Sequence, residues 1–383
     1  MKSVYYCGNP GFRINDILGI GRPKNGIFSW FENKKISKTF MARTAIQRIV
    51  EILGIGPQDE LLIPSYNCGS EIDPLYKSGT RISVYRVDKS ARVDFDDVKR
   101  KISGRTRAIY LTHYFGFLSD AVEMAKLCRD KNLLLIEDCA LSLFSEINGR
   151  KAGTFGNVAV FSISKTVPVR AGALVINDEH FAQKEWQMRS PGNDLNSILP
   201  LIKGAFFETL QKFGLPGPLM KSAFETMRRH KDDDFDYYSF RPPIAGHMFC
   251  KPELADLKIT AISDYFLNRI DPKEVIEKRR RNFLLLLQNV KARPGIAHFF
   301  HDLPPGVCPL YFPVLALERA RLCKYLFQRM IDAPQWWFGY HPSINWDDFP
   351  EACYLKDHLL QLPIHWRLSE QAMLYIARQV NEF

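Results

Sequence analysis

Two side chains of this sequence follow apolar runs typical of buried strands, and their types suggest covalent and acid–base chemistry. Lys165 follows the run 158–161, and Asp138 ends the run 133–137. A lysine in such a place is usually a solvated cap, and it binds an aldehyde only if its pKa is lowered and the aldehyde is held beside it. A buried aspartate needs a cationic or hydrogen-bonding partner, unless it is the N-cap of a following helix. A cap explains Asp138 alone, whereas a binding site explains both residues.

A third group lies upstream, at the start of a helix predicted over 41–53 from apolar residues at helical spacing. Arg43 and Thr44 fall in its first turn. Free backbone N–H groups, the helix dipole and a hydroxyl make such a turn an anion site, although Thr44 on its own is also a capping residue. Ser162 offers a further hydroxyl three residues before Lys165. A phosphate site, an acid for a ring nitrogen and an amine for an aldehyde are together what pyridoxal 5′-phosphate (PLP) requires.

The elements that must position these groups alternate between short apolar runs and amphipathic stretches. Helical spacing over 119–132, behind the cap candidates Ser119 and Asp120, predicts one of the intervening helices. Continuously apolar strands joined by helices indicate an α/β fold with a mostly parallel sheet covered on both faces. Ligands of such sheets gather at the carboxyl ends of the strands. The predicted strands fall within 60–66, 81–87, 107–114, 132–140, 157–164 and 172–178.

The rest of the chain lacks this alternation of apolar runs and amphipathic stretches. Residues 194–238 are expected to form a helical insertion that packs on the domain or on a partner subunit, with a membrane-surface helix as the alternative. Beyond residue 246, helix-like stretches surround the strand-like segment 308–316, which indicates a smaller α+β domain. We therefore predict a large domain over 1–245 and a small C-terminal domain over 246–383.

Composition and charge limit the classes of function that this protein can have. The chain has 383 residues and a formal charge of +10, which favours anionic partners, but no basic stripe interleaved with aromatics predicts nucleic-acid binding. Its eight cysteines form neither C-x-x-C pairs nor a disulfide scaffold, and no run has membrane-spanning length. The pair His298 and His301 lacks a third ligand, so no metal site is expected. We expect a cytoplasmic protein without an integral membrane segment.

Several segments occur in the order seen in the DegT-type (DegT/StrS) aminotransferases, and the chain resembles that family from about residue 40 to its C-terminus. These segments are ARTAI, DELLIPSYNCGSEIDPLYKSGT, RTRAIYLTHYFG, LLLIEDCALSLFSEINGRKAGTFGNVAVFSISK and LLQLPIHWRLSE. The resemblance implies fold type I, PLP and amino transfer from glutamate to a keto sugar, commonly nucleotide-linked, in surface-polysaccharide or antibiotic-type metabolism. It also implies a ping-pong cycle and a homodimer with the active site at the subunit interface.

The resemblance assigns roles to individual residues. Lys165 would form the internal aldimine, Asp138 would protonate the pyridine nitrogen, and Thr44 with Ser162 would hold the phosphate. Arg43 stands where the family has glycine and would add charge at the phosphate.

Departures from the family pattern mark other positions. Leu141 replaces a glutamine expected at the ring hydroxyl. Cys68 falls where an aromatic ring normally stacks on the cofactor, so Tyr66 or Tyr114 is expected to stack instead. His113 ends another strand and is expected to line the pocket.

Two other functions fit the same sequence features. A PLP-dependent sugar dehydratase of the same family typically has histidine at the position of Lys165, so the lysine argues against it. A PLP-binding or regulatory homologue without turnover is suggested by Leu141, by Cys68 and by the run VRAGALV at 169–175, which departs from the glycine-rich run that the family has after the lysine. Production of 2-oxoglutarate from glutamate and a keto sugar separates an aminotransferase from that homologue.

Overall fold

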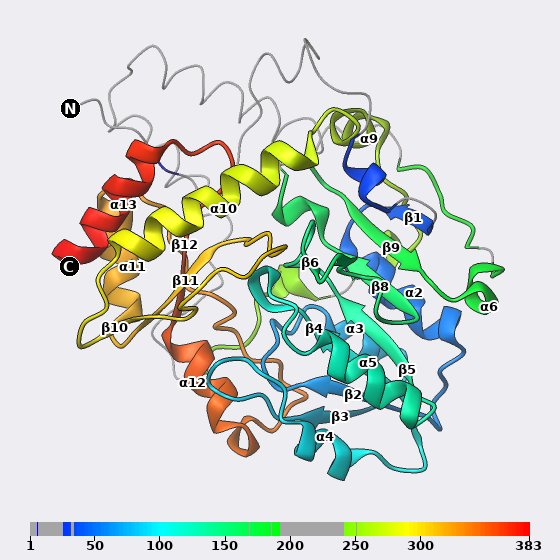
Figure 1. Cartoon of the computed structure of the whole chain (residues 1–383). Coiled ribbons are helices and arrows are strands. Elements are labelled where there is room, and N and C mark those ends of the chain that lie inside the picture. The colour runs from blue at the N-terminus through cyan, green and yellow to red at the C-terminus, as the bar shows by residue number, and fades with distance from the viewer. Residues whose placement is uncertain are drawn as a thin grey trace.

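The computed structural model describes residues 6, 26–31, 34–167, 169–184, 186–191, 241–249 and 251–383. The predicted insertion over 194–238 lies outside these residues. Within them, a seven-stranded sheet and a three-stranded sheet lie side by side, with helices around both (Figure 1). In this described part of the chain, no helix combines the length and apolar character needed to cross a membrane.

The large sheet has the strand order β1-β9-β8-β5-β4-β2-β3. The five strands from β8 to β3 run parallel, whereas β9 pairs antiparallel with both β8 and β1. All six predicted strands are confirmed, because short and continuously apolar runs are typical of strands in a sheet that helices cover. The bounds are β1 Lys35–Thr39, β2 Glu60–Pro64, β3 Arg81–Tyr85, β4 Thr106–Thr112, β5 Leu134–Asp138, β8 Val158–Phe161 and β9 Gly172–Ile176.

Helices flank this sheet and set where its strands end. The predicted helix over 41–53 is α2, Ala42–Leu53, which packs on β8 and β9, and α5, Ala121–Asp130, packs on β4 and β5. Gly54 ends α2 in the left-handed conformation, at φ 67°. The remaining helices of this part are α3 Ile72–Lys77, α4 Phe95–Lys101 and α6 Glu179–Ala182, and the hairpin strands are β6 Glu146–Ile147 and β7 Arg150–Lys151.

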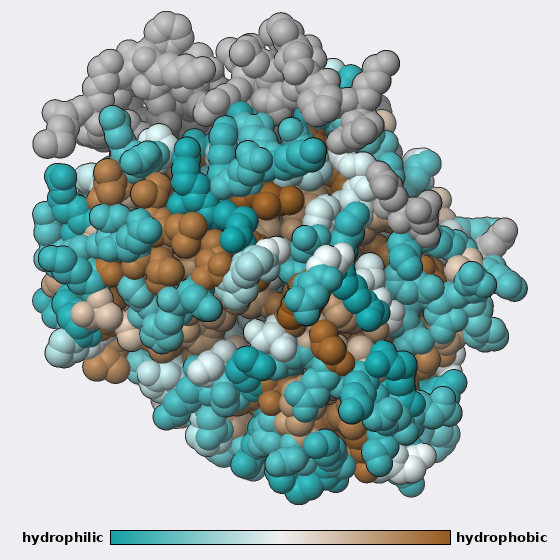
Figure 2. Space-filling view, in the orientation of Figure 1, coloured by the Kyte–Doolittle hydropathy of each residue, from teal (hydrophilic) through white to brown (hydrophobic). Residues whose placement is uncertain are grey.

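The C-terminal part is built on an antiparallel sheet in the order β10-β11-β12, with bounds Ile296–His298, Phe312–Ala316 and Leu359–Leu362. The predicted strand over 308–316 is β11. Its helices are α9 Ala261–Leu267, α10 Pro272–Asn289, α11 Arg319–Gln328, α12 Pro350–His358 and α13 Glu370–Glu382. Polar side chains cover most of the face in Figure 2, and apolar patches lie among them along α10. This part is the small α+β unit that the sequence predicts.

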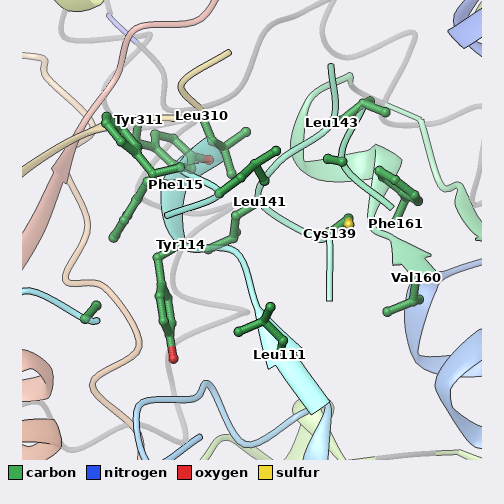
Figure 3. Packing of buried hydrophobic residues seen from close by; sticks show 14 of the residues in the cluster. Leu111, Tyr114, Phe115, Cys139, Leu141, Leu143, Val160, Phe161, Leu310 and Tyr311 are labelled. Carbon is green, nitrogen blue, oxygen red and sulfur yellow. The ribbon is translucent and has the colours of Figure 1, made fainter. Parts of the chain in front are cut away.

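The two sheets share one continuous hydrophobic cluster. Figure 3 shows Leu141 and Phe115, from the large sheet's loops, packing near Leu310 and Tyr311, which lead into β11. Beyond residue 246, Lys258 still forms an isolated bridge with Thr39 at the edge of the large sheet. A division into domains at 245/246 stays a prediction.

Candidate active site

A cavity of about 710 Å³ lies at the carboxyl ends of β5 and β8, against the first turn of α2. Its walls come from both parts of the chain, since residues of the large sheet share the lining with Met248, Phe249, Lys251, Leu254 and Trp337. The lining residues are Phe40, Met41, Ala42, Arg43, Thr44, Ile46, Cys68, Ser70, Glu71, Asp138, Ala140, Ser162, Ser164, Lys165, Arg170, Met248, Phe249, Lys251, Leu254 and Trp337. Six of the eight side chains predicted to bind a cofactor are therefore brought together.

Lys165 ends a single 3₁₀ turn, Ile163–Lys165, that begins directly after β8. The turn is fixed at both ends, because the Lys165 N–H donates to the Ser162 carbonyl at 3.1 Å and the Ser164 N–H donates to the Ala171 carbonyl at 3.1 Å. The ammonium lies 5.7 Å from the centroid of the Trp337 ring. The side chain is half-buried, so Lys165 is open to the cavity on one side and held by a rigid turn on the other.

Asp138 is the last residue of β5 and is 3% exposed. Burial and the negative charge of Glu71 raise the pKa of the Asp138 carboxyl to about 6, against the opposing effects of the Lys165 ammonium and of the Ala140 N–H, which donates to Oδ1 at 2.9 Å. The raised pKa means that nearby positive charge does not fully offset the cost of burying the charged carboxylate. A cationic group in the cavity would supply that charge, as the sequence predicted for a protonated ring nitrogen.

The first turn of α2 offers an anion site. Its N-cap residue Met41 provides no side-chain hydrogen bond to the helix. The start of the helix therefore has no capping side chain, and its first-turn residues line the cavity. Thr44 lines the cavity, and its hydroxyl donates to the Met41 carbonyl at 2.6 Å. The hydroxyls of Ser162 and Ser164 lie 3.3 Å apart on the opposite wall. The N–H groups of Ala42 and Arg43 and the hydroxyls of Ser162 and Ser164 fit a phosphate group, whereas the Thr44 hydroxyl would have to turn away from the Met41 carbonyl to donate to it. The sequence analysis did not single out Ser164.

Cys68 and Glu71 form a buried pair on another wall. The Cys68 N–H donates to Glu71 Oε1 at 2.9 Å, and its thiol donates to Oε2 at 2.7 Å. Burial, together with the Glu71 charge, raises the pKa of the Cys68 thiol to about 12. The thiol is therefore protonated at neutral pH and is a hydrogen-bond donor, not a nucleophile. Glu71 was not singled out in the sequence, although it follows Cys68 by three residues at the same strand end.

Tyr66, Tyr114 and His113 lie outside the cavity lining. Tyr66 is fully buried behind Trp337, with ring centroids 5.3 Å apart, and Tyr114 packs against both rings. Trp337 lines the cavity, as do Phe40 and Phe249, and its ring is the one of these three that lies beside the Lys165 ammonium. No local signal in the sequence marks it, because it joins the site only through tertiary packing. A part for Tyr66 or His113 in cofactor binding stays a prediction.

His113 belongs to a second buried group with Glu137 and Cys139, whose potential ligand atoms lie within 4.8 Å of one another. The His113 Nε2 lies 2.9 Å from Glu137 Oε2, and backbone N–H groups of 153–156 donate to both carboxylate oxygens at 2.6–3.0 Å. Glu137 thus anchors a loop through three backbone hydrogen bonds and pairs with His113 through a fourth, and we assign no metal to the group. Since neighbouring residues of a strand point to opposite faces, His113 lies away from the side of Asp138.

Leu141, which stands where the family resemblance expects glutamine, is 1% exposed and does not line the cavity. It packs among Tyr114, Phe115 and Leu310 (Figure 3). The contact expected from a glutamine is therefore replaced by hydrophobic packing between the two parts of the chain.

Gly172 sits where β9 passes closest to α2. A Cβ atom there would lie 2.5 Å from the Ala42 nitrogen and 2.6 Å from the Met41 carbonyl carbon. We expect Gly172→Ala to displace the start of α2, to cost about 1–3 kcal/mol of stability as overpacking does, and to weaken phosphate binding. Calorimetric titration with PLP measures the affinity. Gly104→Ala is the control, because nothing lies within 4 Å of that site; equal affinity in both variants would contradict the expectation.

The large sheet, the smaller α+β unit and a cavity at the strand ends define a fold type I architecture. The chain matches the DegT/DnrJ/EryC1/StrS aminotransferase family over residues 35–198. It is 32% identical over 323 residues to GDP-perosamine synthase of Vibrio cholerae, covering 81% of this chain and 82% of that protein, and 30% identical over 339 residues to GDP-perosamine synthase of Escherichia coli, covering 86% and 80%.

Solved structures of other proteins share the fold of this chain. Helicobacter pylori PseC, an aminotransferase involved in the biosynthesis of pseudoaminic acid, superposes with a TM-score of 0.67 at 16% identity, covering 99% of this chain and 98% of that one. The chain belongs to the DegT/DnrJ/EryC1/StrS aminotransferase family and is an aminotransferase.

Proposed function

We propose that the protein is a PLP-dependent aminotransferase that moves an amino group from an amino acid, with glutamate as the expected donor, to a nucleotide-linked keto sugar. The observation that carries the proposal is that Lys165, Asp138 and the uncapped start of α2 line one cavity. An amine, a carboxylate in need of a cation and an anion site match the aldehyde, the ring nitrogen and the phosphate of PLP.

Each residue has a separate task in this proposal. When bound, PLP supplies an electron-withdrawing ring that stabilises negative charge on the substrate carbon. Lys165 would hold the cofactor's aldehyde carbon and, once its Nζ is displaced by the donor amine, would carry the proton to and from the substrate carbon. Asp138 would keep a proton on the ring nitrogen. The first turn of α2 with Thr44, Ser162 and Ser164 would hold the phosphate.

The charges around the cavity support an anionic acceptor. Arg43, Arg170 and Lys251 line it in addition to Lys165, whereas Glu71 and Asp138 are the acidic residues among the described lining. The Arg43 guanidinium donates to the Phe249 carbonyl at 3.2 Å, and the Arg170 guanidinium lies 5.5 Å from the Phe40 ring centroid. Such a cationic rim attracts phosphates. The two relatives described above are named for a GDP-linked sugar.

We further propose a cytoplasmic homodimer whose active site is completed at the subunit interface, as the family resemblance implies. Sedimentation velocity of the purified protein checks the assembly. A species of twice the chain mass is expected, and a monomer at micromolar concentration would remove this part of the proposal.

The test of the function is steady-state production of 2-oxoglutarate from glutamate by the PLP-loaded protein. Keto sugars linked to GDP, UDP and dTDP are compared with the same sugars lacking the nucleotide. Turnover that requires a nucleotide-linked keto sugar is the expected result. Binding of PLP without turnover on any acceptor would favour the regulatory homologue instead.

A further inference from the structure

Lys356 is a fully buried lysine whose three ammonium hydrogens are matched by three backbone carbonyl oxygens. It lies in α12, and its Nζ donates to the carbonyls of Asn67 at 2.6 Å, Gly339 at 2.7 Å and Trp337 at 3.0 Å. Among the described residues no carboxylate forms an ion pair with it. A buried ammonium that is expensive to desolvate is thus stabilised by backbone oxygens of two separate loops.

Both of these loops contribute to the wall of the cavity, through Cys68 on one and Trp337 on the other. Asn67 directly precedes Cys68, and its side-chain amide donates to the Pro64 and Ser65 carbonyls at 3.0 Å, which fixes this loop to the end of β2. Trp337 itself lines the cavity, and its backbone carbonyl accepts a hydrogen bond from Lys356 Nζ. Lys356 is a charged residue that connects the Asn67 loop of the large sheet with the Trp337 loop of the C-terminal part.

We propose that Lys356 is a positioning residue that fixes the spacing between Cys68 and Trp337, and so the width of the cavity between them. The inference rests on the proposed function only for the identity of the molecule that fills that space. Lys356 touches neither the reacting groups nor the cavity itself, and it acts through the two loops.

The charge on Lys356 makes this spacing sensitive to pH. Burial lowers the pKa of the Lys356 amine to about 8. The neutral amine has two hydrogens instead of three, so one of the three carbonyls loses its donor above that pH. The titratable and charged groups that face Lys356 or its backbone are Cys68, Glu71, Arg319, Tyr340, His341, Cys353 and Asp357.

The experiment measures the affinity of the protein for 4′-deoxypyridoxine 5′-phosphate, which lacks the aldehyde and so reports the cavity without covalent capture by Lys165. We expect Lys356→Met to weaken binding about tenfold or more, because hydrogen bonds from a charged group are lost. Lys101→Met is the matched control. The Lys101 ammonium also donates to a backbone carbonyl, that of Val84 at 2.6 Å, but lies away from the cavity, and its loss should leave the affinity unchanged.

A pH series keeps the inference testable even if Lys356→Met does not fold. The affinity of the wild-type protein and of Lys101→Met should fall as the pH rises through about 8, whereas Lys356→Arg, which stays charged, should lack that step. A wild-type profile without a step near pH 8 would overturn the inference, as would unchanged affinity in a folded Lys356→Met protein.

A ligand-free measurement separates this inference from the proposed function. Trp336 and Trp337 are stacked, with ring centroids 5.3 Å apart, so near-ultraviolet circular dichroism reports their arrangement. A changed tryptophan signal in Lys356→Met but not in Lys101→Met supports the positioning role. If Lys356→Met shows that difference but the wild-type protein binds no phosphopyridine, the proposed function fails while the inference stands.

Discussion

Lys165→Ala is expected to abolish covalent capture of PLP and to lower turnover by at least about 10²–10⁴-fold, the range that loss of a positioned proton carrier alone produces. The physical reason is that the rigid turn after β8 places the Lys165 amine at the cavity, and the methyl group of alanine can neither hold an aldehyde carbon nor carry a proton. The measurement is borohydride reduction of the PLP-loaded protein, followed by mass spectrometry of the modified peptide.

Lys251→Ala is the matched control for that variant, since Lys251 is another lysine of the same cavity lining. It should keep the reduced PLP adduct on Lys165. An adduct that persists in Lys165→Ala, or that disappears in Lys251→Ala, would show that the wrong lysine has been assigned.

Asp138→Asn is expected to lower turnover by about 10²–10³-fold, as removal of one preorganised charged partner of the reaction does. The asparagine keeps the shape of the side chain, and its amide oxygen can still accept the Ala140 N–H. It lacks the negative charge that would hold a proton on the ring nitrogen. Steady-state kinetics with saturating PLP measures the loss, and full activity in the variant would remove Asp138 from its proposed role.

The pH dependence gives the same residue a second test. The pKa of the Asp138 carboxyl is about 6, so the carboxylate is charged above this pH and becomes neutral below it. PLP affinity should therefore fall as the pH drops through about 6 in the wild-type protein, but not with this midpoint in Asp138→Asn. Glu71→Gln removes the neighbouring negative charge that raises the pKa of Asp138, so the midpoint should move to lower pH. An unmoved midpoint would contradict this account of the pKa.

The sequence predicted the large sheet well because most of its strands are short, apolar and buried on both faces. It missed β1, an edge strand whose sequence KISKT has one apolar residue, Ile36, and so lacks the apolar run of the other strands. It also gave no sign that β9 runs antiparallel to β8, because strand direction depends on the connection and not on the apolar run itself.

The site was predicted where its residues lie directly at strand ends or in the first turn of a helix, as Lys165, Asp138 and Thr44 do. Trp337 and Lys356 could not be found in this way. Trp337 reaches the cavity from the C-terminal part through tertiary packing, and Lys356 acts on it from behind the wall. The hydrogen bond from Lys356 to the Asn67 carbonyl joins positions with no local relation in the sequence. Ser164 and Glu71 stood next to predicted residues, and the recurrence of polar side chains at the same strand ends was the available signal.

The most direct test of the central claim is a single half-reaction. PLP-loaded protein is mixed with glutamate in the absence of any keto acceptor. The amount of 2-oxoglutarate is then measured in molar equivalents per protein chain. The account predicts about one equivalent, after which production stops until a nucleotide-linked keto sugar is added, and no product from Lys165→Ala. No 2-oxoglutarate from the wild-type protein, or continuous production without an acceptor, would contradict amino transfer through this site.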